Sequence, residues 1–145
     1  MYKHLLVATD GSELAAKAVE QGLALGKTLG AKVMIMTVTE PWTMVAPGEI
    51  GMTIPVDDYD EGVTEHATKI LDAAKLQAKT SGTDCDDLHV KDRYPADGIL
   101  ETAKDKGCDL IIMASHGRRG IARLLIGSQA NRVVTHSPIP VLICK

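Results

Sequence analysis

Short apolar runs alternate with longer amphipathic stretches along the whole chain. The apolar runs indicate buried strands, and the stretches between them repeat their apolar residues at helical spacing. The predicted strands are residues 4–8, 32–38, 86–91, 109–114 and 138–144. The predicted helices are residues 14–29, 61–81, 96–106 and 127–136. Strands that alternate with helices in this way predict a parallel sheet, because parallel neighbours need crossover connections.

Most of the predicted strands are apolar on both faces, which indicates a sheet covered by helices on both sides. Residues 86–91 are more polar and fit a strand at the edge of the sheet. A chain of 145 residues with no interdomain linker is of the right size for one such unit. We therefore expect a single α/β domain over residues 1–145, built on an open parallel five-stranded sheet with helices on both faces.

Composition and charge narrow the range of functions. The net charge of −3 argues against a general nucleic-acid binder, so no nucleic acid is expected as a partner. No apolar run approaches the roughly 20 residues of a membrane span, and the first residues do not form a secretory leader. Cys85, Cys108 and Cys144 lack metal-ligand spacing and are expected to be reduced thiols. We expect a cytoplasmic protein that makes no membrane contact.

An open parallel sheet binds its ligands beyond the carboxyl ends of its strands. The residues that follow the first, second and fourth predicted strands are therefore candidates for a site: Ala8, Thr9, Asp10, Val38, Thr39, Glu40 and residues 113–117. Asp10 would also suit an ordinary Asx turn before the first helix. Val38 would also suit the core, a role that is compatible with lining an apolar pocket.

The segment MASHGRRGIARLLIGSQANRV, residues 113–133, has the character of a phosphate cradle. Gly117 and Gly127 allow close approach of the backbone, and the start of the following helix offers amides and a positive dipole. Hydroxyls and positive charge come from Ser115, Ser128, Arg118, Arg119 and Arg123. A tight turn with solvated surface arginines would show the same residues, so the pattern alone leaves both interpretations open.

These motifs resemble the universal stress protein family, of the nucleotide-binding type. The resemblance runs through VATDGS, TVTEP, MASHGRRG, GSQANRVV and the terminal PIPVLICK, and so covers nearly the whole chain. The family motif Gly-x2-Gly-x9-Gly-Ser/Thr is matched at Gly117, Gly127 and Ser128. Ala114 stands in place of the first glycine. Its methyl group could weaken the fit of a ribose against that backbone, although no donor is lost.

The resemblance implies a Rossmann-like fold, similar to the adenine-nucleotide alpha-hydrolases, with strand order 3-2-1-4-5. It also implies that ATP, ADP or AMP binds at the strand ends, with Mg²⁺ held through the phosphates. By the same resemblance Ala8, Thr9 and Asp10 would lie at the adenosine end, Val38 would line the adenine, and the backbone of Met113 and Ala114 would touch the ribose. The residues implied on the phosphate side are Ser115, His116, Gly117, Arg118, Gly127, Ser128, Gln129 and Ala130.

Few residues suggest chemistry beyond binding. His116 could act as a general base beside the phosphates, but no nucleophile–base pair accompanies it, so we predict no catalytic residue and at most weak hydrolysis. The acidic residues 57, 58, 60 and 61 could hold a metal, but they suit the start of a helix better. The apolar connection of residues 40–60 could form a lid or contact a second subunit.

The terminal strand is apolar on both faces and would leave one sheet edge unprotected. Pairing of this edge with a second copy predicts a homodimer through Ile139 to Cys144, as the family resemblance also implies. With the family resemblance, this implies a dimeric, ATP-dependent switch in a stress response. The alternatives are a dimeric interaction protein that uses no nucleotide, and a slow ATP hydrolase that uses His116.

Overall fold

The computed structural model of the chain describes residues 1–42, 55–117 and 126–145. Its strands are β1 (His4–Ala8), β2 (Lys32–Thr39), β3 (Asp86–Lys91), β4 (Leu110–Ala114) and β5 (Val141–Cys144). Its helices are α1 (Glu13–Leu29), α3 (Val56–Ser81), α4 (Pro95–Asp105) and α5 (Ser128–His136). Every strand and helix predicted from the sequence is therefore present and in the predicted order.

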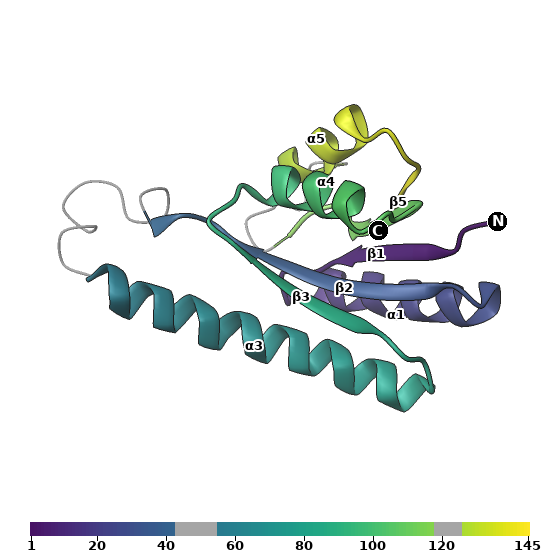
Figure 1. Ribbon diagram of the computed structural model, residues 1–145, viewed down its shortest axis with the longest axis horizontal. Coiled ribbons are helices and arrows are strands. Elements are labelled where there is room, and N and C mark those ends of the chain that lie inside the picture. Colours follow the sequence, from purple (N-terminus) through teal and green to yellow (C-terminus); the bar gives the residue numbers. More distant parts are fainter. Residues whose placement is uncertain (43–54, 118–125) are drawn as a thin grey trace.

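The strands form one parallel sheet with the order β3-β2-β1-β4-β5. This arrangement confirms the predicted α/β fold and the order 3-2-1-4-5. In the centre, Leu6 pairs with Met34 of β2 on one side and with Ile111 of β4 on the other. The polar strand β3 lies at one edge, as predicted, and β5 lies at the other (Figure 1). The strand order reverses between β1 and β4, where such a sheet leaves a crevice at its carboxyl edge.

Helices cover both faces of the sheet, which also confirms the prediction. On one face α1 and α3 pack on alternate strand residues such as Leu5, Val7 and Ile35, all fully buried. On the other face α4 and α5 pack on the intervening residues, including Leu6 and Ile111 (Figure 1). Successive strand residues point to opposite faces, so each strand contributes to both cores.

Helix α1 begins and ends where its sequence indicates. The Ser12 hydroxyl accepts a hydrogen bond from the Ala15 amide at 3.3 Å, which satisfies one of the unpaired donors at the helix start. At the other end Gly30 has a φ of 63°, a left-handed conformation in which glycine carries no side-chain penalty. Helix α1 therefore starts directly after β1, at the carboxyl edge of the sheet.

The predicted start of α3 is wrong by five residues: the helix begins at Val56 rather than residue 61. Asp57 and Asp58 therefore lie within the first helical turn, where the helix dipole favours negative charge. The hydroxyl of Tyr59 donates to the Glu40 carbonyl at 2.9 Å and ties this turn to the end of β2. The interpretation of residues 40–60 as a lid or subunit contact rests on residues 43–54, which lie outside the described ranges.

Strand β5 begins at Val141, three residues later than predicted. Pro138 and Pro140 explain the difference, because proline has no amide hydrogen to donate to a neighbouring strand. The Pro140 carbonyl still accepts from the Ile111 amide at 3.0 Å, so the segment approaches β4 before the strand begins.

The cysteines are free thiols, in agreement with the sequence prediction. Burial raises the pKa of the Cys108 thiol to about 11, so it stays protonated near neutral pH. Over the described parts of the chain, no helix combines the length and apolar character needed to cross a membrane.

Candidate functional site

The ends of β1 and β4 lie side by side at the carboxyl edge, and hydrogen bonds continue past both strands. The Thr9 amide donates to the Met36 carbonyl at 2.9 Å. The Ser115 amide donates to the Cys144 carbonyl at 2.8 Å. The residues predicted to follow β1 and β4 are therefore held by the sheet itself, and their positions at its edge are well defined.

Asp10 forms the turn between β1 and α1. Its Oδ1 atom accepts from the Ser12 amide at 3.0 Å, which confirms the Asx-turn interpretation. Its Oδ2 atom lies against the Cα of Gly117, so close that a β-carbon at position 117 would overlap it. One carboxylate thus both forms the turn after β1 and contacts the loop after β4. This contact brings two sequence-predicted site residues together.

The start of α5 is docked on the end of β4. The Gly127 amide donates to the Ser115 carbonyl at 2.6 Å. A β-carbon at position 127 would lie 3.2 Å from that carbonyl oxygen and 3.3 Å from the Cα of His116, so glycine permits this close packing. The predicted role of Gly127 therefore needs refinement: here its amide serves the protein rather than facing outward.

Three further amides of the predicted cradle belong to residues 128–130. Gly127 is the N-cap of α5, and its carbonyl accepts the helical bond from the Asn131 amide at 2.9 Å. The amides of residues 128–130 precede that bond, and in an α-helix such amides have no partner within the helix. Ser128 is exposed, whereas Ala130 is buried in the core beneath the helix. This first turn can offer backbone donors to an anion.

Ser115 and His116 contact each other. The Ser115 Oγ atom and the His116 Nδ1 atom are 3.2 Å apart, with Ser115 almost fully buried and His116 half-buried. The Ser115 hydroxyl is thus hydrogen-bonded to the imidazole, so these two residues, both predicted on the phosphate side, form a pair with each other. Arg118, Arg119 and Arg123, predicted to supply positive charge, lie outside the described residues.

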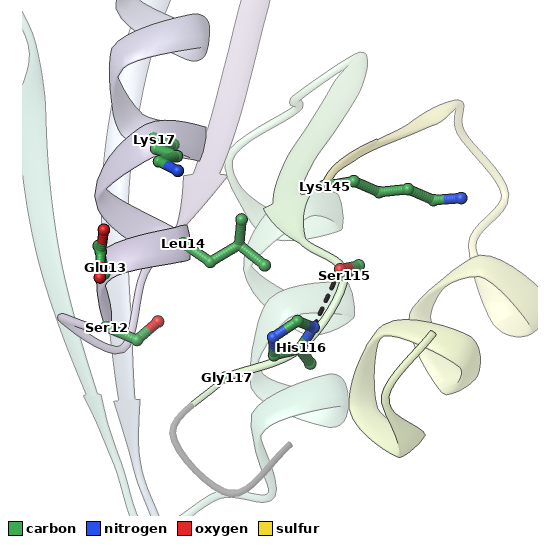
Figure 2. Close-up of a pocket in the computed structure, with 8 residues that line it drawn as sticks. All are labelled: Ser12, Glu13, Leu14, Lys17, Ser115, His116, Gly117 and Lys145. Atoms are coloured by element: carbon green, nitrogen blue, oxygen red, sulfur yellow. Dashed lines mark hydrogen bonds between the residues drawn. The ribbon is translucent and has the colours of Figure 1, made fainter. Parts of the chain in front are cut away.

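A pocket of about 530 Å³ opens beside Ser115, His116 and Gly117. Figure 2 shows its lining, in which Leu14 of α1 extends toward Ser115 and the His116 ring turns to the Ser115 hydroxyl. The other lining residues are Ser12, Glu13, Lys17 and Lys145. The sequence reasoning missed Lys17 and Lys145. Their signals were weak: Lys17 lies one turn into α1, and Lys145 directly follows β5.

Three of the predicted adenosine-side residues lie on the sheet face covered by α4 and α5. Ala8, Val38 and Met113 all belong to the core cluster on that face. Val38 packs so closely on α4 that a β-carbon at Gly98 would lie 3.1 Å from its Cγ2 atom. Val38 is therefore a core residue, as one interpretation held, and its partial exposure still allows it to line a pocket.

Ala114 points the other way. It is 7% exposed and belongs to the core cluster on the face of α1 and α3. Its methyl group is therefore accommodated by that core, on the face opposite to Ala8, Val38 and Met113. The structure thus provides no steric conflict between this methyl and a ribose on the α4 side.

Fold and site together define a single-domain, Rossmann-like α/β protein whose polar loop residues gather at the carboxyl edge of a parallel sheet. The model of the universal stress protein family matches residues 1–145. The chain belongs to the universal stress protein family.

Individual relatives agree with this assignment. Universal stress protein YxiE of Bacillus subtilis is 32% identical to the chain, and the match covers all of both proteins. The solved structure of hypothetical protein MJ0577 of Methanocaldococcus jannaschii superposes with a TM-score of 0.83 at 29% identity, covering 100% of this chain and 96% of that one. A universal stress protein solved in complex with cAMP superposes with a TM-score of 0.71 at 26% identity, covering 99% and 97%.

Proposed function

We propose that this protein binds ATP, or a related adenine nucleotide, at the carboxyl edge of its sheet. The observation that carries the proposal is the docking of the α5 start on β4, where Gly127 packs against Ser115 and His116. Because of this docking, the amides of residues 128–130 lie near the end of β4. The cAMP complex of a relative that is 26% identical over nearly the whole chain supports an adenine nucleotide as the ligand.

In this proposal the nucleotide lies across the strand ends. Ala8, Val38 and Met113 would provide the apolar wall for the adenosine part, with Asp10 and Thr9 at its polar end. The amides of residues 128–130, with the Ser128 hydroxyl, would bind the phosphates, because a helix start attracts anions. Residues 115–117 also border a pocket whose other lining comes from α1 and Lys145. Mg²⁺ would be held through phosphate oxygens.

We also propose that the protein acts as a homodimer in the cytoplasm and that nucleotide occupancy changes what the dimer presents to other proteins. The edge position of β5 supports this proposal, since an edge strand carries backbone groups that can pair with another chain. Leu142 in this strand is 39% exposed, an apolar residue that a second copy would cover. Two copies of β5 would pair with each other about a two-fold axis, which gives a closed dimer.

The test is calorimetry on purified protein freed of carried-over nucleotide, with ATP, ADP and AMP titrated separately. Micromolar binding of at least one of them is expected, together with the same nucleotide in the denatured extract of untreated protein. A protein that binds none of them would instead fit the nucleotide-independent interaction protein.

Hydrolysis is tested on the same preparation. The Ser115–His116 pair is the feature that favours a hydrolase, because a histidine near the phosphates can accept a proton from water. A switch predicts turnover that is negligible and equal in wild type and His116→Ala. Turnover that falls sharply in His116→Ala, with nucleotide affinity unchanged, would identify a slow ATP hydrolase.

A further inference from the structure

Helix α4 begins without a side-chain cap of its own. Its N-cap position is Tyr94, which makes no capping hydrogen bond, and Pro95 follows with no amide hydrogen. The next amide belongs to Ala96, a fully buried residue. A buried amide without an acceptor is costly, so the start of α4 requires a partner from elsewhere in the fold.

Gln129 of α5 supplies that partner. Its side-chain Oε1 atom accepts from the Ala96 amide at 3.0 Å, and the side chain is half-buried between the two helices. Gln129 is the second residue of α5, so its own amide belongs to the first turn proposed to bind phosphate. One residue therefore carries a cradle amide on its backbone and caps a neighbouring helix with its side chain.

The first turns of α4 are in turn fixed against the proposed adenosine wall. A β-carbon at Gly98 would lie 3.1 and 3.2 Å from the two methyl groups of Val38, so helix and strand are in intimate contact there. Ala96 and Ile99 are buried in the same core. The start of α4 is thus in contact with β2 on one side and with the start of α5 on the other.

A second contact joins the two helices farther along. Arg132 of α5 donates to the Asp97 carboxylate at 3.0 Å. Both side chains are substantially exposed, at 52% and 34%, and exposed ion pairs contribute little because water screens them. Arg132 therefore provides a matched control, since it links the same helices without capping either one.

We propose that Gln129 is a positioning residue for nucleotide binding: its side chain, anchored on the Ala96 amide, sets the first turn of α5 at a fixed place relative to Val38. This inference rests on the proposed function and adds to it. Because α4 is held by its own core packing, loss of the bond leaves the adenosine side in place and loosens the first turn of α5, which then keeps, among the described residues, only the docking of Gly127 on Ser115 and the burial of Ala130. The residue therefore determines how much the phosphates add to the affinity for adenosine.

The experiment compares wild type, Gln129→Met and Arg132→Met for the affinities of ATP and of adenosine. Methionine keeps the length of glutamine and removes the acceptor. Gln129→Met is expected to weaken ATP binding by about fivefold to tenfold, as the loss of one buried hydrogen bond implies, with adenosine affinity unchanged. Arg132→Met is expected to leave both affinities as in wild type. Amide hydrogen exchange of ligand-free protein should show faster exchange of the Ala96 amide in Gln129→Met only.

The outcomes separate the two proposals. Wild-type protein that binds neither ligand overturns the proposed function, and the role of Gln129 falls with it. If Gln129→Met binds ATP as tightly as wild type does, only the positioning role is overturned. Equal losses of ATP and adenosine affinity, or an equal loss in Arg132→Met, would also overturn it, because either result would indicate a general effect of helix packing. Unchanged exchange of the Ala96 amide would show that the bond does not hold this helix start.

Discussion

The carboxylate of Asp10 lies against the Cα of Gly117, which joins the turn after β1 to the loop after β4. The same carboxylate accepts from the Ser12 amide at 3.0 Å. Any side chain at position 117 must therefore displace Asp10 from its place in the turn. The contact therefore couples the positions of these two residues at the carboxyl edge.

Gly117→Ala is therefore expected to weaken nucleotide binding more than it weakens the fold. The clash falls on a side chain rather than on backbone, so the fold should lose only what the Asx-turn hydrogen bond to Ser12 contributes, about 1 kcal/mol. ATP affinity should fall by about tenfold, because the displaced carboxylate can no longer occupy the polar end of the proposed adenosine site, where it would accept a hydrogen bond. Calorimetry and thermal unfolding measure the two effects. In an Asp10→Ala background the glycine substitution should add no further loss of affinity, and an independent additional loss would contradict the coupling.

Gly127→Val should abolish ATP binding and leave the sheet folded. A branched side chain would enter space within 3.3 Å of the Ser115 carbonyl and the His116 backbone, and would push the start of α5 away from β4. Circular dichroism and calorimetry provide the measurements. Gly62→Val is the matched control, because Gly62 is exposed in α3 with open space around it, and it should bind ATP normally. ATP binding that survives Gly127→Val would contradict the assigned phosphate site.

Ala114→Gly should not improve binding, although it restores the glycine of the family motif. The Ala114 methyl is buried on the α1 side of the sheet, away from the proposed ribose position. We expect a change of less than about twofold in the ATP Kd and a loss of about 1 kcal/mol in the free energy of unfolding, since a buried methyl and backbone rigidity are lost. Urea unfolding measures the free energy of unfolding, and calorimetry measures the ATP Kd. A large gain in affinity would show that the methyl obstructs the ligand.

Much of the fold was predictable because its signals are local. The apolar runs depend on neighbouring residues, and each of them led to a strand that the structure contains, although β5 begins three residues later than predicted. The start of α3 was not predicted correctly, because acidic residues are common both in loops and in first helical turns. At the site, the sheet order brings Asp10 and Gly117 to one edge, which the alternation of strands and helices indicated. The contact between their atoms depends on how two loops pack, and no local pattern encodes it.

The roles of Gln129 and Gly127 were also beyond the sequence. The family resemblance implied phosphate binding by both, and this role stays a prediction. That Gln129 would cap α4 depends on how α4 and α5 lie beside each other, which is a property of the assembled fold. That the Gly127 amide would bond to Ser115 depends likewise on the path of the loop back to β4.

The free energy of unfolding should depend on pH through Asp109, which directly precedes β4 at the amino edge of the sheet. Burial raises the pKa of this carboxyl, but hydrogen bonds from the His4 and Lys3 amides, at 3.0 and 2.8 Å, outweigh it and leave the pKa below its ordinary value. The stabilisation is therefore present above the unfolded pKa of about 3.9 and is lost as pH falls through the folded pKa. Asp109→Asn should be less stable than wild type at pH 7, and the difference should narrow below about pH 4. Urea unfolding at several pH values tests this, and a difference independent of pH would contradict it.

Ile143→Pro should convert the proposed dimer to a monomer. The carbonyls of Pro140 and Cys144 accept hydrogen bonds from the amides of Ile111 and Ser115, so by the alternation of strand groups the backbone of Ile143 faces the open edge. Proline there removes an outward amide and leaves the pairing with β4 intact. Ile143→Thr, which keeps that amide, is the control for the side chain. Light scattering gives the molar mass, and an unchanged dimer in Ile143→Pro would place the interface elsewhere.

All strands of the sheet run in one direction, so the chain enters β1 at the edge opposite to the site and leaves β5 at the edge that carries it (Figure 1). Lys145, which follows β5, lines the pocket beside His116 and Gly117. A fluorophore or affinity tag attached after Lys145 would therefore sit beside residues 115–117 and next to the open strand edge. The same label attached before Met1 would be distant from both, and it is the choice that leaves titrations and mass measurements undisturbed.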